Sequence, residues 1–298
     1  MKYFEKYPII MIVIGVLGVS FSSIFVKLST APSAVTAQIR LLWTVLLMSP
    51  VVWGKREVRQ ELLQVDKKSL VLSAFSGLFL AFHFLTWFES LQHTSVASAA
   101  TIGCTEVIWV ALGYCLFMKG KISKKAMGII LFTFVGSILI AYVDSSEGGV
   151  HLLGDFLALA SAVLVAVYTL LGREVRKKVS TSVYTYVVYV VCAVTLFVVC
   201  MSQGYEIFSY GINVIIVGFL LAVFSTILGH SIFSWCLKYF SPAFVSASKL
   251  CEPVIASIIA VFLFGELPTI IQIIGGAMII GGVYCYSQIE KSEEKYEY

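Results

Sequence analysis

Long apolar segments dominate this chain and constrain its fold more than any other feature. A bilayer core about 30 Å thick needs about 20 mostly apolar residues per spanning helix. With 59% hydrophobic and only 13% charged residues, the chain departs from soluble domains, in which about a quarter of residues are charged. We therefore predict an all-α integral membrane protein with ten transmembrane helices. The segments are 8–27, 33–53, 70–91, 95–118, 126–143, 151–171, 181–203, 212–237, 242–264 and 268–287.

Basic residues predict how these helices are oriented, because lysine and arginine concentrate in cytoplasmic loops. Loops on one side of the predicted bundle, with both termini, carry 18 basic residues, whereas the other side carries Lys27 alone. We predict that both termini lie in the cytoplasm and that the chain is a multi-pass protein of a bacterial-type cytoplasmic membrane. The net charge of +4 then reflects orientation, and no nucleic-acid partner is expected. The first segment lacks a small-residue cleavage motif, so we interpret it as a retained helix.

Two parts of the chain repeat one another. A shift of 146 residues aligns 93–117 with 239–264 and superposes Ser95 on Ser241, Ala97 on Ala243 and Glu106 on Glu252. Each unit holds five predicted helices, and an odd number inserts the second unit upside down, which gives an inverted repeat. The predicted division is a first five-helix repeat at 1–147, a second at 148–288 and a disordered cytoplasmic tail at 289–298.

This arrangement resembles the drug/metabolite transporter superfamily, specifically its EamA-type members. Residues 229–282 carry the resemblance, with a small-residue helix, a mid-helix proline (Pro253), the turn Leu263–Glu266 and a glycine-rich last helix. The first half departs from this pattern, since Val107 replaces the proline and MKGKIS replaces the Gly-Glu turn. The resemblance implies a central cavity lined by helices one, three, four, six, eight and nine, with five and ten peripheral. It implies transport of amino acids, nucleotide sugars, vitamins, choline or other metabolites.

Glu106 and Glu252 are the strongest candidates for a binding site. Each lies about ten residues into its span, so a rise of 1.5 Å per residue places both near the membrane midplane. Charged residues at that depth are costly and usually functional. The two glutamates bind a substrate amine or a proton, or else each is a neutral carboxyl held between helices. Lys249 precedes Glu252 by three residues on one helical face, and it either neutralises Glu252 or binds a substrate carboxylate.

Histidine and aromatic residues complete the predicted substrate site. His83 and Trp87 lie one turn apart, either as packed core residues or as a pH-sensitive cavity wall with an aromatic surface for a cation. His230 and Trp235 form a weaker second pair. The inverted repeat predicts that His83 lies in the outer membrane half and His230 in the inner half, as at two gates. Ser22, Ser23 and Tyr168 are further candidates for cavity lining. Arg40, seven residues into its span, is expected to snorkel to the outer surface.

The function indicated is secondary transport of a small metabolite by alternating access around a midplane cavity. An exported amino acid or related amine is favoured, because carboxylates and a lysine match the two ends of a zwitterion. A quaternary amine or another cation is the alternative, and protons are possible coupling partners. Walker motifs, HExxH and GxSxG are absent from the sequence, so ATP drive and intramembrane catalysis are not expected. We predict no enzyme activity, cofactor or metal. A membrane receptor or structural protein without flux is a less favoured alternative.

Overall fold

The computed structural model describes residues 7–94, 96–144, 152–252, 254–255, 258 and 269–294. Every regular element within these ranges is a helix. In the first half the helices are α2 (Pro8–Ser20), α3 (Ser22–Lys27), α4 (Ser33–Gly54), α5 (Arg56–Gln64), α6 (Lys67–His93), α7 (Val96–Gly103), α8 (Glu106–Phe117) and α9 (Lys124–Asp144). In the second they are α10 (Leu152–Arg176), α11 (Thr181–Ser202), α12 (Ile212–Leu220), the π-helix η1 (Leu221–Ser231), α13 (Ile232–Cys236), α14 (Pro242–Ser248), the 3₁₀-helix η2 (Lys249–Cys251) and α16 (Ile270–Glu294).

Six helical segments of the described chain are long and apolar enough to cross a membrane individually. They are Pro8–Lys27, Ser33–Gly54, Lys67–His93, Leu152–Arg176, Thr181–Ser202 and Ile212–Cys236. Helices also occupy the predicted spans 95–118, 126–143 and 268–287, and α14 begins where the ninth span was predicted. Most of the rest of that span, including Pro253, lies outside the described residues. The protein is thus an all-helical, multi-pass membrane protein.

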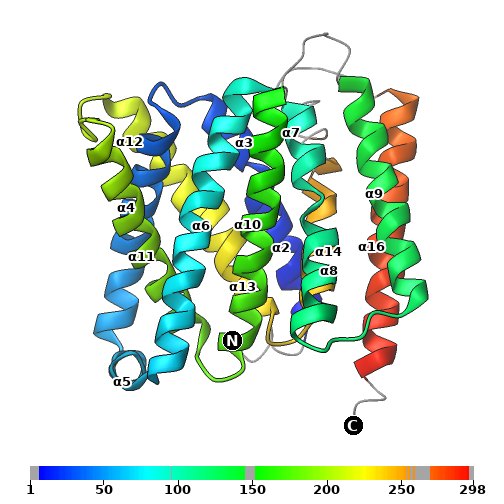
Figure 1. Ribbon diagram of the computed structural model, residues 1–298, viewed down its shortest axis with the longest axis horizontal. Coiled ribbons are helices and arrows are strands. Elements are labelled where there is room, and N and C mark those ends of the chain that lie inside the picture. Colours follow the sequence, from blue (N-terminus) through cyan, green and yellow to red (C-terminus); the bar gives the residue numbers. More distant parts are fainter. Residues whose placement is uncertain are drawn as a thin grey trace.

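The helices stand side by side as an upright bundle (Figure 1). At one edge α9 packs along α16, and at the other α4, α11 and α12 lie together. α6 and α10 pack extensively against each other in the middle of the bundle, and α2 packs against η1. The position of α9 and α16 at the edge agrees with the peripheral placement that the family resemblance implied for helices five and ten.

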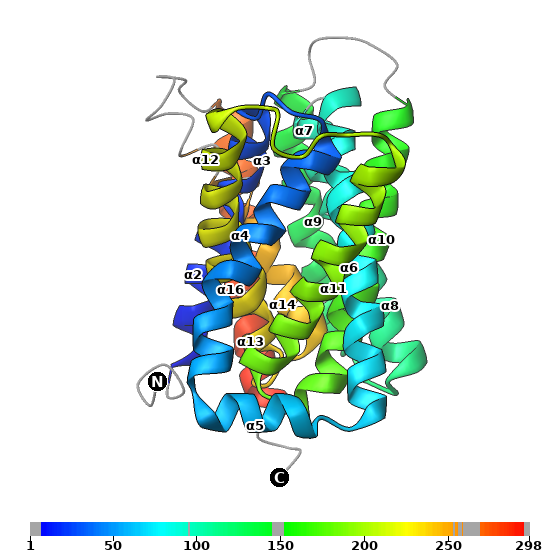
Figure 2. The same ribbon diagram turned by 90° about the vertical axis from the view of Figure 1, so that its left-hand side faces the viewer.

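One end of the bundle gathers the basic connections. The α4–α6 connection with α5, the α8–α9 connection and the α10–α11 connection all lie at the lower end, where α2 begins and α16 ends (Figures 1 and 2). These connections and the helix ends that adjoin them carry 13 of the 21 lysine and arginine residues of the chain. A single basic end is the distribution expected of a membrane protein with a cytoplasmic face there.

Two local features differ from the sequence prediction. α5 lies across the lower end of the bundle (Figure 2), where a loop was expected. It forms because Val58 and Leu62 share an apolar face that packs on the core, while its Glu61 accepts a hydrogen bond from the Ser180 amide at 2.6 Å. The prediction of a disordered tail from residue 289 was wrong for 289–294, because α16 continues to Glu294. Residues 295–298 lie outside the described chain.

A side-chain cap fixes the start of α6. The Asp66 carboxylate accepts hydrogen bonds from the Ser69 amide at 3.0 Å and the Ser69 hydroxyl at 2.6 Å. These bonds favour the ionised carboxylate and so lower the pKa of Asp66 below its ordinary value. The cap satisfies an amide that has no partner inside the helix, and it sets where the chain turns from α5 into α6.

Close packing of α9 on α16 depends on glycine. A Cβ atom at Gly136 would lie 2.8 Å from the carbonyl oxygen of Gly275 and 3.0 Å from a side-chain carbon of Ile279. Small residues let membrane helices approach closely, and van der Waals packing then replaces the hydrophobic effect as the source of association. The glycine-rich last helix is therefore used, at this position, for contact within the chain.

We expect Gly136→Ala to destabilise the protein, because its methyl group would meet backbone atoms that cannot move independently. Overpacking of this kind costs about 1–3 kcal/mol. The control is Gly128→Ala in the same helix, where a Cβ atom has no neighbour within 4 Å. That change should leave stability unchanged or raise it by about 0.5–1 kcal/mol through helix propensity. Thermal unfolding in detergent would compare the two, and equal effects would contradict the close-packing interpretation.

Candidate functional site

A cavity lies inside the bundle where the two predicted repeats meet. Its water-accessible volume is about 90 Å³, several times the 10–15 Å³ that one water molecule needs. Its walls come from α2, α3, α4, α6, α7, α8, α10, η1, α14 and η2. This set includes all six helices that the resemblance implied and adds α4, through Arg40.

The cavity lining itself shows the internal repeat. Four pairs of lining residues are separated by the 146-residue shift: Ala100 and Ser246, Gly103 and Lys249, Cys104 and Leu250, and Glu106 and Glu252. Corresponding residues of the two repeats therefore line the same cavity. The pairs also show where the repeats differ, because glycine in the first stands opposite lysine in the second.

Both glutamates follow an interruption in a helix. α7 ends at Gly103, two turn residues follow, and α8 begins at Glu106. The Thr105 hydroxyl donates to the Ile102 carbonyl at 2.6 Å, a local bond that competes with regular helix geometry. In the second repeat the 3₁₀ turn η2 separates α14 from Glu252. Interrupted helices of this kind leave backbone polar groups available beside a cavity inside a membrane.

An ion pair joins the two repeats across the cavity. The Lys249 ammonium lies 2.7 Å from a carboxylate oxygen of Glu106. The two side chains are only 14% and 10% exposed, and Thr169 donates a further, longer hydrogen bond of 3.4 Å to Glu106. The sequence left two roles open for Lys249, neutralising Glu252 or binding a substrate carboxylate, and its direct ion pair is instead with Glu106. A buried carboxylate needs a partner, and Lys249 is the partner of the more buried Glu106.

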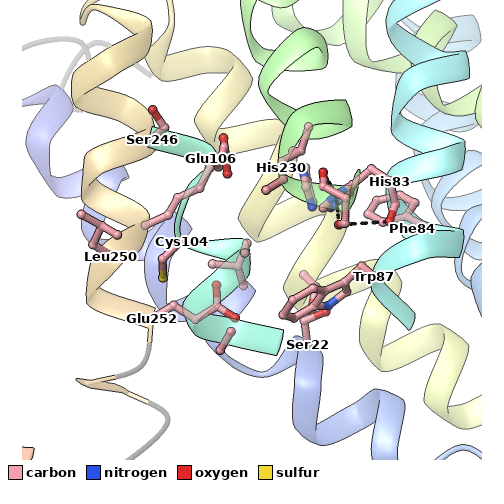
Figure 3. Close-up of a pocket in the computed structure, with 18 of the residues that line it drawn as sticks. Ser22, His83, Phe84, Trp87, Cys104, Glu106, His230, Ser246, Leu250 and Glu252 are labelled. Carbon is pink, nitrogen blue, oxygen red and sulfur yellow. Dashed lines mark hydrogen bonds and ion pairs between the residues drawn. The ribbon is translucent and has the colours of Figure 1, made fainter. Parts of the chain in front are cut away.

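Glu252 is the less constrained of the two glutamates. It lines the cavity and is partly buried. Within the described residues its carboxylate makes no ion pair and no side-chain hydrogen bond. Figure 3 shows Glu106 and Glu252 on one side of the cavity, with Cys104 between them. A carboxylate in this setting is available to a cationic group of a ligand.

Histidine rings from the two repeats meet on the opposite side of the cavity (Figure 3). The centroids of the His83 and His230 rings are 6.0 Å apart, and the His230 ring also contacts Phe84 at 5.3 Å. His83 Nδ1 forms a 2.8 Å hydrogen bond with the Ser161 hydroxyl. The two histidines therefore lie together at one place in the cavity and not apart, as two separate gates would require. His230 lies in the π-helix η1, which departs from the regular α-helix assumed for that span.

The remaining predicted residues divide into two groups. Ser22 and Trp87 line the cavity, as expected. Tyr168 and Trp235 are not among its described lining residues. Tyr168 donates to or accepts from the Ser234 hydroxyl at 2.8 Å and packs behind His230 at 6.0 Å. Trp235 packs against Tyr239 in a tilted arrangement with ring centroids 4.4 Å apart.

Arg40 is the residue that sequence reasoning misplaced. It does not snorkel, because it is only 1% exposed and lines the cavity. Its Nε donates to the Thr226 hydroxyl at 2.7 Å, and its guanidinium carbon lies 4.0 Å above the Phe84 ring. The signal was present in the sequence, since a charged residue inside an apolar span is a candidate functional group.

Both halves of the chain are similar to a known protein family. Residues 6–142 and 152–288 each match the EamA-like transporter family. The chain belongs to this family. Both matched stretches of this EamA-like transporter contain one of the paired glutamates and its interrupted helix.

Relatives of the EamA-like transporter occur in bacteria and archaea. An uncharacterized transporter of Clostridium kluyveri is 24% identical over 69% of this chain and 68% of its own length. One of Archaeoglobus fulgidus is 23% identical over 82% of this chain and 83% of its own. A solved crystal structure superposes with a TM-score of 0.76 at 16% identity, covering 97% of this chain and 99% of that one. This last similarity shows a shared fold.

Membership of the family establishes a membrane transporter with a small-molecule substrate and a lipid environment. Within the described residues, no group of three or more His, Cys, Asp or Glu side chains is placed to hold a metal ion.

The Lys249–Glu106 pair should stabilise the transporter. Lys249→Met leaves a buried carboxylate without its partner, and we expect a loss of about 3 kcal/mol. Adding Glu106→Gln should recover part of that loss, with a coupling energy of about 1–3 kcal/mol in a double-mutant cycle. Thermal unfolding in detergent would provide the four stabilities.

The matched control for this cycle is the exposed pair Lys177–Glu174, which has the same 2.6–2.7 Å separation but side chains 53% and 43% exposed. Its coupling should stay below about 1 kcal/mol. Additive effects of Lys249→Met and Glu106→Gln would show that the two residues do not act as a pair.

Proposed function

We propose that this EamA-like transporter is a secondary transporter that exports an amino acid or a related amine from the cytoplasm by alternating access. The substrate occupies the cavity between the two repeats, which then opens to one side of the membrane at a time. No cofactor takes part and no covalent chemistry is catalysed. The cycle is driven either by coupled protons or by the gradient of the substrate itself, and nucleic acids are not partners.

One observation carries the proposal: a partly buried Glu252 carboxylate lines the cavity without an ion pair among the described residues. An unpaired carboxylate inside a membrane protein is costly unless it meets water, a proton or a cation. A substrate ammonium group is a partner that can arrive from the cytoplasm and leave on the other side. Beside Glu252, the Lys249–Glu106 pair links the repeats that must move relative to each other.

The aromatic wall supports a second candidate substrate. Trp87 and Phe84 line the cavity, and aromatic faces attract quaternary ammonium groups. A cationic compound would use Glu252 and these rings without needing any positive group of the protein. A receptor or structural protein without flux is less favoured, because an interrupted helix at the same place in both repeats is a feature of transport sites.

We further propose that ten helices cross the membrane as a five-plus-five inverted repeat with both termini in the cytoplasm of a bacterial-type cell. Two successive family matches, at 6–142 and 152–288, support a repeat. The lower end of the bundle, with its basic connections (Figure 2), supports a cytoplasmic location for that end.

Glu252→Gln tests the proposed function directly. Replacing the carboxylate by a neutral amide removes the attraction for an ammonium group, and we expect transport into proteoliposomes to fall at least about tenfold. Counterflow of radiolabelled amino acids and amines would measure it. Glu89→Gln is the control, because this partly exposed glutamate is not among the described lining residues of the cavity and pairs with His93 near the end of α6. Normal flux in Glu252→Gln would refute the site.

Orientation can be tested with single cysteines in exposed connections. Ser209→Cys lies between α11 and α12, and Gln60→Cys lies in α5. A membrane-impermeant maleimide should label Ser209→Cys in intact cells and Gln60→Cys only after permeabilisation. The parent protein, whose exposed cysteines Cys115 and Cys285 lie on membrane helices, provides the background. Labelling of Gln60→Cys in intact cells would invert the proposed topology.

A further inference from the structure

Three buried polar atoms without a hydrogen-bond partner belong to residues that line the cavity. They are Arg40 Nη2, Ser225 Oγ and His230 Nδ1, and they are three of only five such side-chain atoms in the described chain. Buried polar groups in proteins almost always have partners. Because three such unpartnered atoms surround one cavity, we expect a ligand in that cavity to be their hydrogen-bond partner.

The three groups also belong to one wall. Ser225 and His230 lie in η1, and Arg40 is fixed to η1 by its 2.7 Å bond to Thr226. Arginine can only donate hydrogen bonds, whereas the serine hydroxyl and a suitably protonated histidine nitrogen can also donate. The missing partner therefore carries acceptor atoms.

The charge of Arg40 makes that partner an anion. Its described contacts are the neutral Thr226 hydroxyl and the faces of Phe84 and Phe88 at 4.0 and 5.8 Å. The other charged groups lining the cavity are Lys249, which is paired with Glu106, and Glu252. Neither the Glu106 nor the Glu252 carboxylate forms an ion pair with Arg40 in the described structure. A buried charge without a counter-ion is strongly unfavourable.

We infer that Arg40, with Ser225 and His230, binds the carboxylate of the transported substrate. This inference rests on the proposed function and narrows it. Arginine suits the role because its planar guanidinium matches a carboxylate geometrically and loses water more readily than an ammonium. Lys249, the sequence candidate for this task, is occupied by Glu106.

The two ends of the cavity then match the two ends of a zwitterion. Glu106 and Glu252 lie on one side, and His83, Phe84 and His230 lie on the other (Figure 3). A substrate ammonium faces Glu252, its carboxylate faces Arg40, and Trp87 lines the space that its side chain enters. A quaternary amine or simple monoamine would leave the guanidinium unpaired. The substrate class is therefore amino acids rather than amines in general.

Matched compounds test this inference on the unmodified protein. Leucine and phenylalanine would each be compared with their methyl ester and their decarboxylated amine, which remove the negative charge and retain the ammonium. We expect at least one acid to bind at least tenfold more tightly than its ester and amine, measured by thermal shift in detergent and by competition in proteoliposomes. Tighter binding of the esters and amines would overturn the inference while leaving the proposed function intact. Failure of every compound would overturn both.

Arg40→Gln and Arg40→Lys identify the group responsible. Arg40→Gln should abolish the preference for acid over ester, and Arg40→Lys should retain part of it. The control is Arg176→Gln, because Arg176 is buried but donates to the carbonyl groups of Ser234 and Val179 outside the cavity lining. It should lower stability without changing the preference. An unchanged preference in Arg40→Gln would refute the assignment.

An inorganic anion is the other possible source of negative charge at Arg40. Measuring the thermal stability of the ligand-free protein after chloride is replaced by gluconate distinguishes a bound inorganic anion from a substrate carboxylate. If Arg40 binds the substrate carboxylate, exchange should leave ligand-free stability unchanged. A loss of stability that Arg40→Gln also abolishes would show a resident chloride and overturn the inference. The anion exchange is carried out on the unmodified protein, so it still tests the inference if Arg40→Gln fails to fold.

Discussion

The hydrocarbon core of a membrane offers no water to a charged side chain, and the interior of this bundle is arranged around that constraint. Four charged residues line the cavity: Arg40, Glu106, Lys249 and Glu252. Lys249 and Glu106 satisfy each other. Arg40 and Glu252 have no such partner in the described chain, and both face the same small space. The pairing of two charges therefore defines which other two remain for a ligand.

Much of the fold followed from the sequence because its causes are local. Bilayer thickness sets the length of apolar segments, so helices fall where 8–27, 33–53, 70–91 and others were predicted. Glu106 and Glu252, which both line the cavity, could be identified as candidates because a carboxylate within an apolar run is conspicuous. Their common cavity also followed, since the 146-residue shift places them at equivalent positions of one repeated unit.

The sequence did not reveal features that depend on contacts between helices. Lys249 and Glu252 are close in sequence, yet the lysine pairs with Glu106, 143 residues away. Arg40 looked close enough to a helix end to reach water, but its side chain packs inward over Phe84. His230 lies in the π-helix η1, and the residue pattern of that segment did not predict a π-helix. In each case the position of the side chain depends on which residues lie opposite it on a neighbouring helix. The periodicity of a single sequence does not contain that information.

The difference between Gly103 and Lys249 has a further consequence for the proposed cycle. If two inverted repeats of identical sequence exchanged conformations, a two-fold rotation would relate the outward-open state to the inward-open state, and the two would have equal free energy. Lys249 has no basic counterpart at Gly103, so the contact it makes with Glu106 cannot be recreated in the exchanged state. One state is thereby favoured, and a difference of only 1.4 kcal/mol gives about a tenfold population bias. Under the proposed cycle, a single lysine would therefore set which of the two states the carrier adopts at rest.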